Sequence, residues 1–410
     1  MTLLYRLFLA SYLAGIRISA AIGNAKARLW MKGREGTWEK LQQLPQDEER
    51  VWFHCASLGE FEQGRPVIEA YRQKYPQHKI LLTFFSPSGY EVRKNYPGAD
   101  YVLSLPMDSP SNSSRFIRYV KPAAAFFVKY DFWHFYLEEL KRKNVPTYVI
   151  ASAFRPGQVY FKWYGTFFRN VLKNITRFYI QDEATGKLLS SIGLTNYLLC
   201  GDTRFDRVQQ VAAGNEAMPL LIEFAKGSEL LVAGSTWPED EKRIVALMAQ
   251  QPGLKVIVAP HEVDEVRIKE IMQNFPEVVR YSEATSESVA TARVILIDSI
   301  GKLSAVYRYG RFAWVGGGFG KGIHNILEAA VYGQPVFFGP NYLKFREARE
   351  LIELKGAVSV TSSEQLLERI REYEKHPEQY AAAATASANY VSSHAGATEK
   401  ILGSIGQESR

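Results

Sequence analysis

Short apolar runs alternate with longer amphipathic stretches along most of this chain, and this alternation constrains the fold more than any other feature. The first series of runs comprises VWFHCAS from Val51, KILLTFF from Lys79, DYVLSL from Asp100, AAAFFVK from Ala123, TYVIASA from Thr147 and RFYIQ from Arg177. Each run has the length of a strand and is mostly apolar, as parallel strands buried on both faces are. Between the first two runs, apolar residues recur at helical spacing and predict a crossover helix. The pattern predicts an α/β fold with parallel sheets.

The alternation pauses over residues 208–228 and then starts again. The second series comprises ELLVAGS from Glu229, KVIVAP from Lys255, RVILID from Arg293, RFAWVGG from Arg311 and PVFFG from Pro335. Because 410 residues exceed what one core usually supports, we expect two domains, with a linker near Ala213–Met218. The predicted organisation is an N-terminal segment 1–35, one Rossmann-like domain 36–213 and a second one 214–410, whose last helix is a candidate to pack back on the first domain.

The N-terminal segment is apolar from Leu3 to Ile16, with Arg6 inside it and five basic residues after it: Arg17, Lys26, Arg28, Lys32 and Arg34. This stretch is shorter than the roughly 20 apolar residues of a membrane span. It favours anchoring at an anionic, cytoplasmic membrane face. A signal peptide or a core helix is the alternative, although a signal peptide usually carries its basic residues ahead of the apolar stretch.

The formal net charge of +7 favours anionic partners, which include nucleic acid, a membrane surface or a phosphorylated substrate. A basic membrane-surface or nucleic-acid-binding protein is therefore the non-enzymatic alternative. No recognised nucleic-acid motif occurs, and the aromatic residues concentrate in the strand-like runs. Cys55 and Cys200 are far apart without metal-ligand spacing, which fits a reducing compartment and argues against a disulfide framework.

Two carboxylates follow predicted strands of the first series. In parallel α/β sheets ligands bind beyond the carboxyl ends of strands, so Glu60 in HCASLGEFEQG and Asp131 in FFVKYDFWHF are candidate functional residues. A carboxylate in a cleft can accept the proton of an attacking hydroxyl. Alternatively, Glu60 complements the positive end of a helix dipole and Asp131 forms a structural ion pair with Lys129.

The glycine-rich segment GGGFGKGIHNILE, from Gly316 to Glu328, follows the strand-like run at Arg311. Exposed backbone N–H groups and the start of a buried helix suit a phosphate. The Walker pattern fails because Gly322 follows Lys321, and the dinucleotide fingerprint fails because Lys321 stands where a glycine is required. Asn325 and Glu328 also fit helix capping without any ligand, and His324 fits a core histidine.

Two further turns follow strands of the second series. AGSTWPEDE places Ser235 and Thr236 before a predicted helix, where a hydroxyl can bind phosphate or cap the helix. VAPHEVDEV places His261 just beyond a strand, where it can meet a base, a phosphate or solvent.

Five segments occur together and in order: HCASLGEFEQ, TFFSPSG, VKYDFW, AGSTWPEDE and GIHNILEAAVYGQPVFFGP. This set resembles the 3-deoxy-D-manno-octulosonic acid (Kdo) transferases of Gram-negative lipopolysaccharide synthesis. The similarity runs over essentially the whole chain, including the apolar N-terminal segment and the basic stretch ARLWMKGREG after it.

The resemblance implies the GT-B glycosyltransferase fold, in which two Rossmann-like domains face a central cleft, here preceded by a membrane-associating helix. It implies an inverting transfer of Kdo from CMP-Kdo to a hydroxyl of the tetra-acylated lipid A precursor (lipid IVA), at the cytoplasmic face of the inner membrane. The expected partners are CMP-Kdo, the lipid A precursor and anionic lipids of that membrane, without nucleic acid. No cofactor and no obligatory metal are expected.

The resemblance also assigns residues. Glu60 matches the catalytic base and Asp131 the second acidic position. The donor-binding positions are Ser235, Thr236, His261, Gly301, Lys302, Gly318, Gly320, Asn325 and Glu328. The acceptor-binding positions are Ser57, Gly59, Ser86, Ser88, Gly89 and Trp133.

Some positions depart from the family pattern. His261 and Glu262 stand where relatives commonly carry Arg-His, and Lys302 stands where an acidic residue is usual. Lys129 and His134 likewise replace an acidic residue and a proline. These departures leave open which cation meets the donor phosphate, and Lys302 is one candidate. Another GT-B nucleotide-sugar transferase or an epimerase is the alternative enzyme, but an epimerase has no need of the apolar N-terminal segment.

Overall fold

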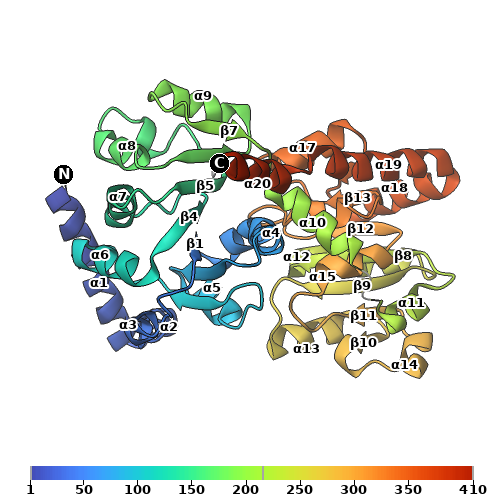
Figure 1. Ribbon diagram of the computed structural model, residues 1–410. Helices are drawn as coiled ribbons and strands as arrows, with labels where there is room; N and C mark the ends of the chain where they lie inside the picture. The colour runs from blue at the N-terminus through green and yellow to red at the C-terminus, as the bar shows by residue number, and fades with distance from the viewer. Residues whose placement is uncertain (1, 215–216, 409–410) are drawn as a thin grey trace. The chain divides into compact units, whose positions relative to one another are not determined.

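The computed structural model describes residues 2–214 and 217–408, which form two compact units (Figure 1). Unit 1 contains Met1–Arg207 and Gly396–Arg410, and unit 2 contains Val208–Ala395. The division falls within helix α10 (Thr203–Ala213), six residues before the expected boundary after residue 213. Residues 215 and 216 of the expected linker lie outside the described residues.

Unit 1 is built on a seven-stranded sheet in which every neighbouring pair is parallel. Its strands are β1 (Arg50–Cys55), β2 (Lys79–Phe84), β3 (Tyr101–Ser104), β4 (Pro122–Val128), β5 (Thr147–Ser152), β6 (Arg177–Ile180) and β7 (Tyr197–Leu199). The order β3-β2-β1-β4-β5-β6-β7 is that of a Rossmann sheet with one added edge strand. The six runs predicted as strands are confirmed. Strand β7 was missed because its three residues are partly exposed and carry no apolar signal of strand length.

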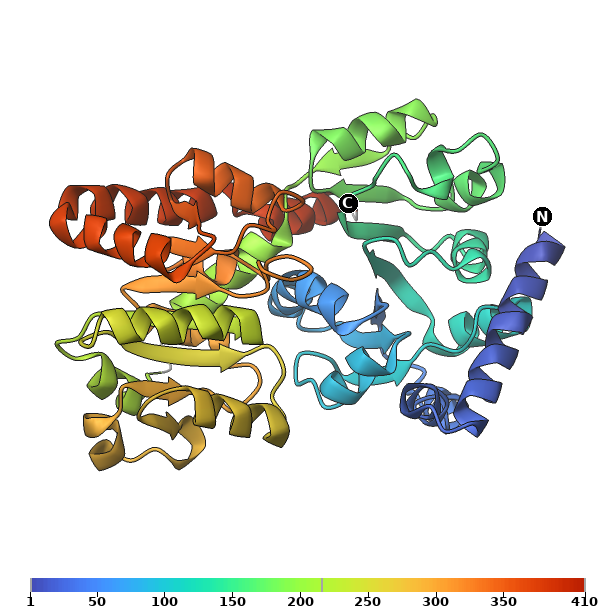
Figure 2. The same ribbon diagram turned by 180° about the vertical axis from the view of Figure 1, so that it is seen from behind.

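Helices cover both faces of this sheet (Figures 1 and 2). They are α1 (Thr2–Ala21), α2 (Ala25–Lys32), α3 (Thr37–Gln42), α4 (Leu58–Lys74), α5 (Pro87–Arg93), α6 (Pro110–Val120), α7 (His134–Arg142), α8 (Thr166–Leu172), α9 (Glu183–Ser191) and α20 (Ala397–Glu408), with a 3₁₀ turn η1 (Val159–Phe161). Alternate residues of β1 enter the two cores, so Trp52 packs on one face while Val51 and Phe53 pack on the other.

The C-terminal helix α20 returns to unit 1. Ala397, Ile401, Leu402 and Ile405 are buried in the same core as Val51 and its neighbours. The Asp206 carboxylate accepts hydrogen bonds from the backbone N–H groups of residues 396 and 398, at 2.6 and 2.7 Å. These contacts make unit 1 discontinuous in sequence.

Unit 2 repeats the same architecture. Its strands are β8 (Leu230–Thr236), β9 (Lys255–Pro260), β10 (Val278–Arg280), β11 (Val294–Leu296), β12 (Phe312–Val315), β13 (Val336–Phe338) and β14 (Ala357–Ser359). All neighbours are parallel, in the order β10-β11-β9-β8-β12-β13-β14. Without β10 this is again the Rossmann order. The five predicted strands are confirmed, whereas the edge strands β10 and β14 were missed because most of their residues are only partly buried and neither forms an apolar run of strand length.

The helices of unit 2 are α11 (Pro219–Ala225), α12 (Pro238–Gln250), α13 (Glu265–Asn274), α14 (Ser286–Thr291), α15 (Leu303–Val306), α16 (Leu327–Ala330), α17 (Arg346–Glu353), α18 (Ser363–Lys375) and α19 (Pro377–His394), with 3₁₀ turns η2 (Tyr281–Glu283) and η3 (Tyr307–Tyr309). Trp314 in the middle of β12 is fully buried and packs with residues of α12 and α18. The core therefore fixes the central strands whose ends carry the predicted donor-binding residues.

Helix α1 lies at the edge of unit 1 (Figure 2) and is longer than the predicted apolar stretch. Its 20 residues are long and apolar enough to cross a membrane, by length and composition only. The Tyr5 hydroxyl donates to the buried Asp108 carboxylate at 2.8 Å, and that carboxylate also accepts from the backbone N–H groups of Phe135 and Tyr136. Burial raises the pKa of Asp108 to about 6. One carboxylate thus joins α1 to the first turn of α7.

Candidate active site

In unit 1 the strand order reverses between β1 and β4, which is where ligands bind in sheets of this kind. Glu60 lies in the first turn of α4, directly after β1, and Asp131 lies in the loop after β4. The structure therefore places both predicted carboxylates at this reversal point. Both side chains are partly exposed and accessible from solvent.

Glu60 has the local contact that capping requires. Its carboxylate accepts a hydrogen bond from the Ser57 backbone N–H at 3.1 Å. Burial raises the pKa of Glu60, and the negative charge of Asp131 adds to this effect, while His54 and Lys129 oppose it. By contrast, Glu62 forms ion pairs with Arg93 at 2.7 Å and with two other arginines. The raised pKa of Glu60 suits its carboxylate to accept a proton, whereas the Glu62 carboxylate is committed to arginines.

A buried hydrogen-bonded chain ends at Asp131. The His54 ring in β1 is fully buried and contacts the Asp131 carboxylate through Nε2 at 2.7 Å and the Thr83 hydroxyl through Nδ1 at 2.8 Å. Trp52 Nε1 donates to the same hydroxyl at 2.8 Å, and Trp133 Nε1 donates to Asp131 at 3.0 Å. The carboxylate is held from two sides.

The Nε2–H of His54 donates to the Asp131 carboxylate. The Thr83 hydroxyl accepts from Trp52 Nε1, contacts Nδ1 of His54 and donates to the Phe53 carbonyl oxygen at 3.5 Å. The indole, imidazole and hydroxyl groups of the chain therefore all have partners. This role of His54 was not predicted, because the residue falls inside an apolar run that has the pattern of a buried strand. The sequence feature that could have revealed it is the position of His54 two residues after Trp52, which places both side chains on the same face of the strand.

Cationic groups surround the end of β4. Lys129 adopts a left-handed backbone conformation with φ of +64°, which is strained for a residue with a side chain. Burial lowers the pKa of Lys129, and the charge of Arg204 lowers it further. The predicted ion pair of Lys129 with Asp131 is not among the observed contacts, because Asp131 accepts from His54 and Trp133 instead. Arg155 is exposed nearby and contributes to the same positive potential.

The predicted acceptor-binding residues have mixed local roles. Ser57 precedes α4 as its N-cap residue, and Gly59 is exposed in the first turn of that helix. Ser86 caps α5 and its hydroxyl contacts that of Ser88 at 3.0 Å. A side chain on Gly89 would lie 2.3 Å from the ring of Phe84, so packing alone requires that glycine.

Trp133 connects the site with the apolar N-terminal helix α1. Its ring packs against Phe85 with centroids 4.7 Å apart, and Phe85 packs in turn against Tyr12 of α1 and Trp30 of α2. Because the Trp133 indole also donates to Asp131, a continuous row of aromatic rings runs from α1 to the candidate catalytic carboxylate.

In unit 2 the strand order reverses between β8 and β12. Ser235 is the last but one residue of β8 and has a strained φ of +51°. The glycine-rich segment follows β12. A side chain on Gly316 would lie 2.2 Å from the Ser235 carbonyl oxygen, and one on Gly318 would lie 2.5 Å from the Gly339 nitrogen. The glycines are therefore needed for close backbone packing at this reversal point.

The glycine-rich segment differs in two ways from the predicted phosphate loop. Five of its backbone N–H groups, those of residues 316, 317, 320, 322 and 324, are engaged inside the protein, and that of Gly317 donates to the buried Asp240 carboxylate at 2.9 Å. The helix that follows, α16, has only four residues, because Gly333 with φ of +65° and Pro335 end the segment before β13. Because a helix of four residues has only a weak dipole, side chains are the main contacts that this segment offers to an anion.

Three rings form a stack beside this segment. His261 lies between Trp237 and His324, with ring centroids 4.9 and 4.2 Å away. Trp237 Nε1 donates to His324 Nε2 at 3.0 Å, so the ring proton of His324 lies on Nδ1. Burial and the neighbouring His261 lower the pKa of His324 to about 4, which keeps the ring neutral at pH 7. The expectation of a core histidine is wrong, since His324 is partly exposed in this stack.

The remaining predicted donor-binding residues lie at the end of β8, in the loop before α15, in the glycine-rich segment and in α16. The Thr236 hydroxyl is buried and donates to Glu241 at 2.8 Å, which makes it a structural group. The Asn325 side chain donates to Glu328 at 3.0 Å and accepts from the Leu327 N–H at 3.3 Å, but the N-cap residue of α16 is Ile326 and not Asn325. Gly301 has a φ of +90°, and the Lys302 ammonium lies over the ring of Tyr281. Gly320 is exposed and open.

Across residues 2–214 and 217–408, no group of three or more His, Cys, Asp or Glu side chains has the arrangement of a metal site.

Two parallel Rossmann-like sheets, each with polar residues at its reversal point, are the architecture of the GT-B fold. Among solved structures, a UDP-N-acetylglucosamine 2-epimerase has this fold, with a TM-score of 0.58, 14% identity and coverage of 87% of this chain and 95% of its own. At this identity the similarity concerns the fold alone. The fold therefore does not separate a transferase from an epimerase.

Sequence similarity separates them. The model of a family described as 3-deoxy-D-manno-octulosonic-acid transferase (kdotransferase) matches residues 31–207. The Kdo transferase of Haemophilus influenzae is 27% identical over 78% of this chain and 77% of its own length. That of Aquifex aeolicus is 27% identical over 75% of this chain and 80% of its own. Residues 31–207 thus match the Kdo transferase family, and the similarity to Kdo transferases over about three quarters of the chain supports a glycosyltransferase.

Proposed function

We propose that the protein transfers Kdo from CMP-Kdo to a hydroxyl of a lipid A precursor during lipopolysaccharide synthesis, at the cytoplasmic face of the bacterial inner membrane. The observation that carries the proposal is Glu60, a solvent-accessible carboxylate with a raised pKa at the reversal point of a sheet in the segment that matches the Kdo transferase family. The apolar helix α1 and the basic residues after it support a lipid acceptor at a membrane.

The proposed reaction is a single displacement. Glu60 takes the proton of the acceptor hydroxyl, and the oxygen of that hydroxyl forms a bond to the anomeric carbon of Kdo. The bond from that carbon to the phosphate oxygen breaks, and CMP leaves with the bonding electrons, so the configuration inverts. Lys129 and Arg155 of unit 1 suit an anionic group of the substrates. Ser235, His261 and His324 of unit 2 are the proposed contacts for the nucleotide, with the Nδ1–H of His324 as a donor.

The direct test uses purified full-length protein with CMP-Kdo generated in the same reaction and a tetra-acylated lipid A precursor in detergent. The expected products are CMP and an acceptor heavier by one or more Kdo residues, detected by mass spectrometry. UDP-N-acetylglucosamine replaces CMP-Kdo in a parallel reaction, in which no product and no epimer are expected. An unchanged acceptor with protein that is folded by circular dichroism would reject the proposal.

The proposed base also predicts a pH dependence. Glu60 must be ionised to accept a proton, so transfer rises with pH through the raised pKa of Glu60 and then levels off. Because the charge of Asp131 contributes to raising that pKa, Asp131→Asn should shift the rising limb of the kcat/KM profile to lower pH. It should also reduce kcat, since an amide holds His54 and Trp133 less firmly than a carboxylate does.

The profile is measured from pH 4.5 to 8 for both proteins. A limb that stays in place in Asp131→Asn would show that another group titrates. A shift to higher pH would contradict the assignment of Glu60 as the base.

A further inference from the structure

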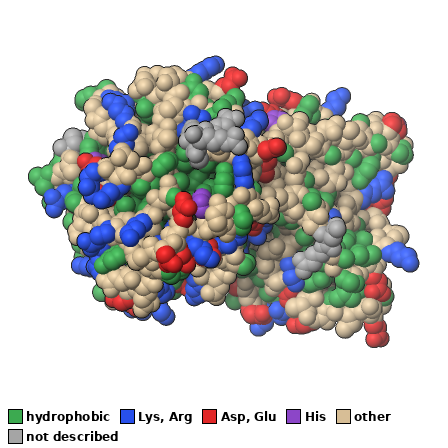
Figure 3. Space-filling model, in the orientation of Figure 1, with side chains coloured by type: hydrophobic (Ala, Val, Ile, Leu, Met, Phe, Trp, Pro, Cys, Tyr) green, Lys and Arg blue, Asp and Glu red, His purple; other side chains and the backbone are tan. Residues whose placement is uncertain are grey.

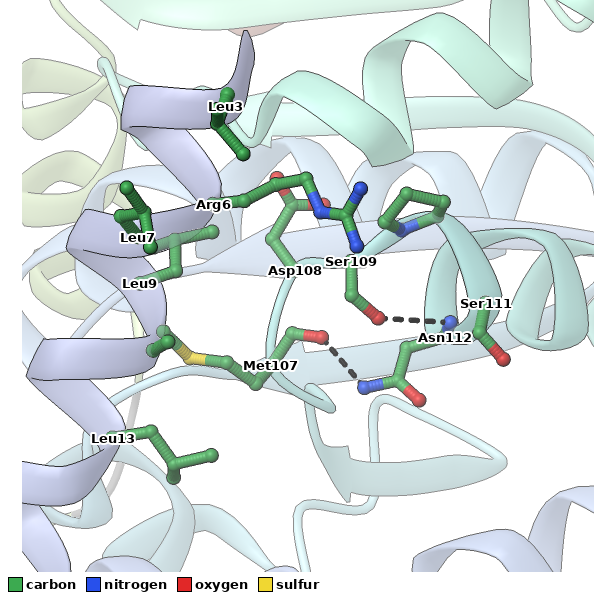
Figure 4. Close-up of a pocket in the computed structure, with 12 residues that line it drawn as sticks. Leu3, Arg6, Leu7, Leu9, Leu13, Met107, Asp108, Ser109, Ser111 and Asn112 are labelled. Carbon is green, nitrogen blue, oxygen red and sulfur yellow. Dashed lines mark hydrogen bonds between the residues drawn. The ribbon is translucent and has the colours of Figure 1, made fainter.

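A cavity of about 670 Å³ lies between helix α1 and the segment that joins β3 to α6, entirely within unit 1 (Figure 4). Six residues of α1 line one wall: Leu3, Arg6, Leu7, Leu9, Ala10 and Leu13. Residues 107–112 line the other wall. The volume is in the range of small-molecule and cofactor sites. None of the lining residues belongs to the candidate active site.

The α1 wall is apolar and open to solvent. Leu3 and Leu7 are 66% and 55% exposed, which is unusual for leucines that face a cavity. Leaving such a wall in contact with water is unfavourable, and filling it with hydrocarbon removes that cost. Hydrophobic side chains lie next to Lys and Arg along this edge of unit 1 (Figure 3).

The mouth of the cavity is cationic and carries hydroxyl groups. Figure 4 shows the Arg6 side chain extending from α1 toward Ser109, at the start of α6. Arg6 has no hydrogen bond or ion pair with another described residue. The nearby Asp108 carboxylate is 3% exposed and is engaged by Tyr5 and two backbone N–H groups. The charge of Arg6 is therefore available to an anion, and the exposed hydroxyl of Ser111 lies on the same rim.

An apolar wall with a cation and a hydroxyl at its mouth matches a phosphate that carries a hydrocarbon chain. We propose that the cavity binds one anionic phospholipid of the bilayer, with an acyl chain along the leucines of α1 and the phosphate between Arg6 and Ser111. The bilayer is the source because α1 contains arginines but no acidic residue and exposes leucines on several sides. This inference rests on the proposed membrane association and does not depend on the transfer reaction.

The experiment measures lipid retained by the full-length protein in mild detergent, by native mass spectrometry after addition of phosphatidylglycerol or phosphatidylcholine. One phosphatidylglycerol per chain is expected, retained at least five-fold more than phosphatidylcholine. Arg6→Gln should reduce retention at least five-fold, whereas Arg17→Gln, the same change on the same helix outside the cavity, should not. Ala10→Phe should fill the cavity and displace the lipid, while Ala14→Phe should leave it bound.

Three outcomes would overturn the inference. Equal losses in Arg6→Gln and Arg17→Gln would indicate diffuse attraction to anionic lipid. Displacement by glycerol 3-phosphate would remove the role of the acyl chain. Displacement by an equal concentration of the lipid A precursor would assign the cavity to the acceptor. Transfer to detergent-dispersed acceptor is assayed in the same samples, so wild-type protein that transfers Kdo but retains no phosphatidylglycerol rejects this inference alone, and wild-type protein that retains the lipid without transferring Kdo rejects only the proposed function.

Discussion

Glu60→Gln is expected to reduce Kdo transfer by about 10²- to 10⁴-fold, which is the usual contribution of a general base. The amide oxygen can still accept from the Ser57 N–H, so the first turn of α4 should remain intact. The substitution removes only the ability to take a proton. Turnover is measured by release of CMP, and donor binding by calorimetry with CMP.

Glu62→Gln is the matched control, because it makes the same change two residues further along the same helix. The Glu62 carboxylate pairs with Arg93 and Arg207, so its loss should change transfer by no more than a few-fold. Comparable losses in the two variants would indicate a general disturbance of α4. Reduced CMP binding in Glu60→Gln would instead give Glu60 a role toward the donor.

Gly318→Ala should destabilise unit 2 by about 3 kcal/mol, since an added methyl group in a tightly packed site that cannot relax costs this much. The new Cβ would lie 2.5 Å from the nitrogen and 2.6 Å from the Cα of Gly339, both backbone atoms. The loop must therefore move away from β13 or the strand must shift. Thermal unfolding followed by circular dichroism measures the loss.

Gly320→Ala makes the same change two residues later, where the nearest atom to the new Cβ is the Gly317 oxygen at 3.7 Å. Stability should change by less than about 0.5 kcal/mol. If the donor approaches this exposed backbone, as proposed, CMP affinity should fall without loss of stability. Unchanged affinity would remove Gly320 from the donor site, and an unchanged melting temperature in Gly318→Ala would contradict the observed packing of the loop.

The architecture was largely predictable because buried parallel strands leave long apolar runs, and eleven such runs appear as strands in the two sheets. The strands that were not predicted are short. The strands β7, β10 and β14 have three residues each and lie at or next to sheet edges, where pairing with a neighbour decides the conformation more than local composition does. The apolar N-terminal helix was predicted too short, because its last turns after Arg17 continue as a helix without continuous apolar residues.

The candidate site was predictable only in part. Position after a strand identified Glu60 and Asp131, since the carboxyl ends of parallel strands share one edge of a sheet. The His54 chain depends on which strand face a side chain takes and on Thr83, which lies 29 residues away, so local sequence gives no sign of it. Thr236 is the opposite case. Its position after a strand predicted a hydroxyl that contacts the donor, but in the fold this hydroxyl donates to Glu241.

The return of α20 to unit 1 affects how the protein is made. The ribosome delivers the seven strands of unit 1 before unit 2 and the residues of α20 after it. Until α20 has been made, the core face that receives Ile401 and Ile405 stays open, and exposed apolar surface of this kind attracts chaperones and proteases. Folding of unit 1 is thus completed only after unit 2 has been synthesised, so that chains truncated before α20 are left with an unfinished first domain.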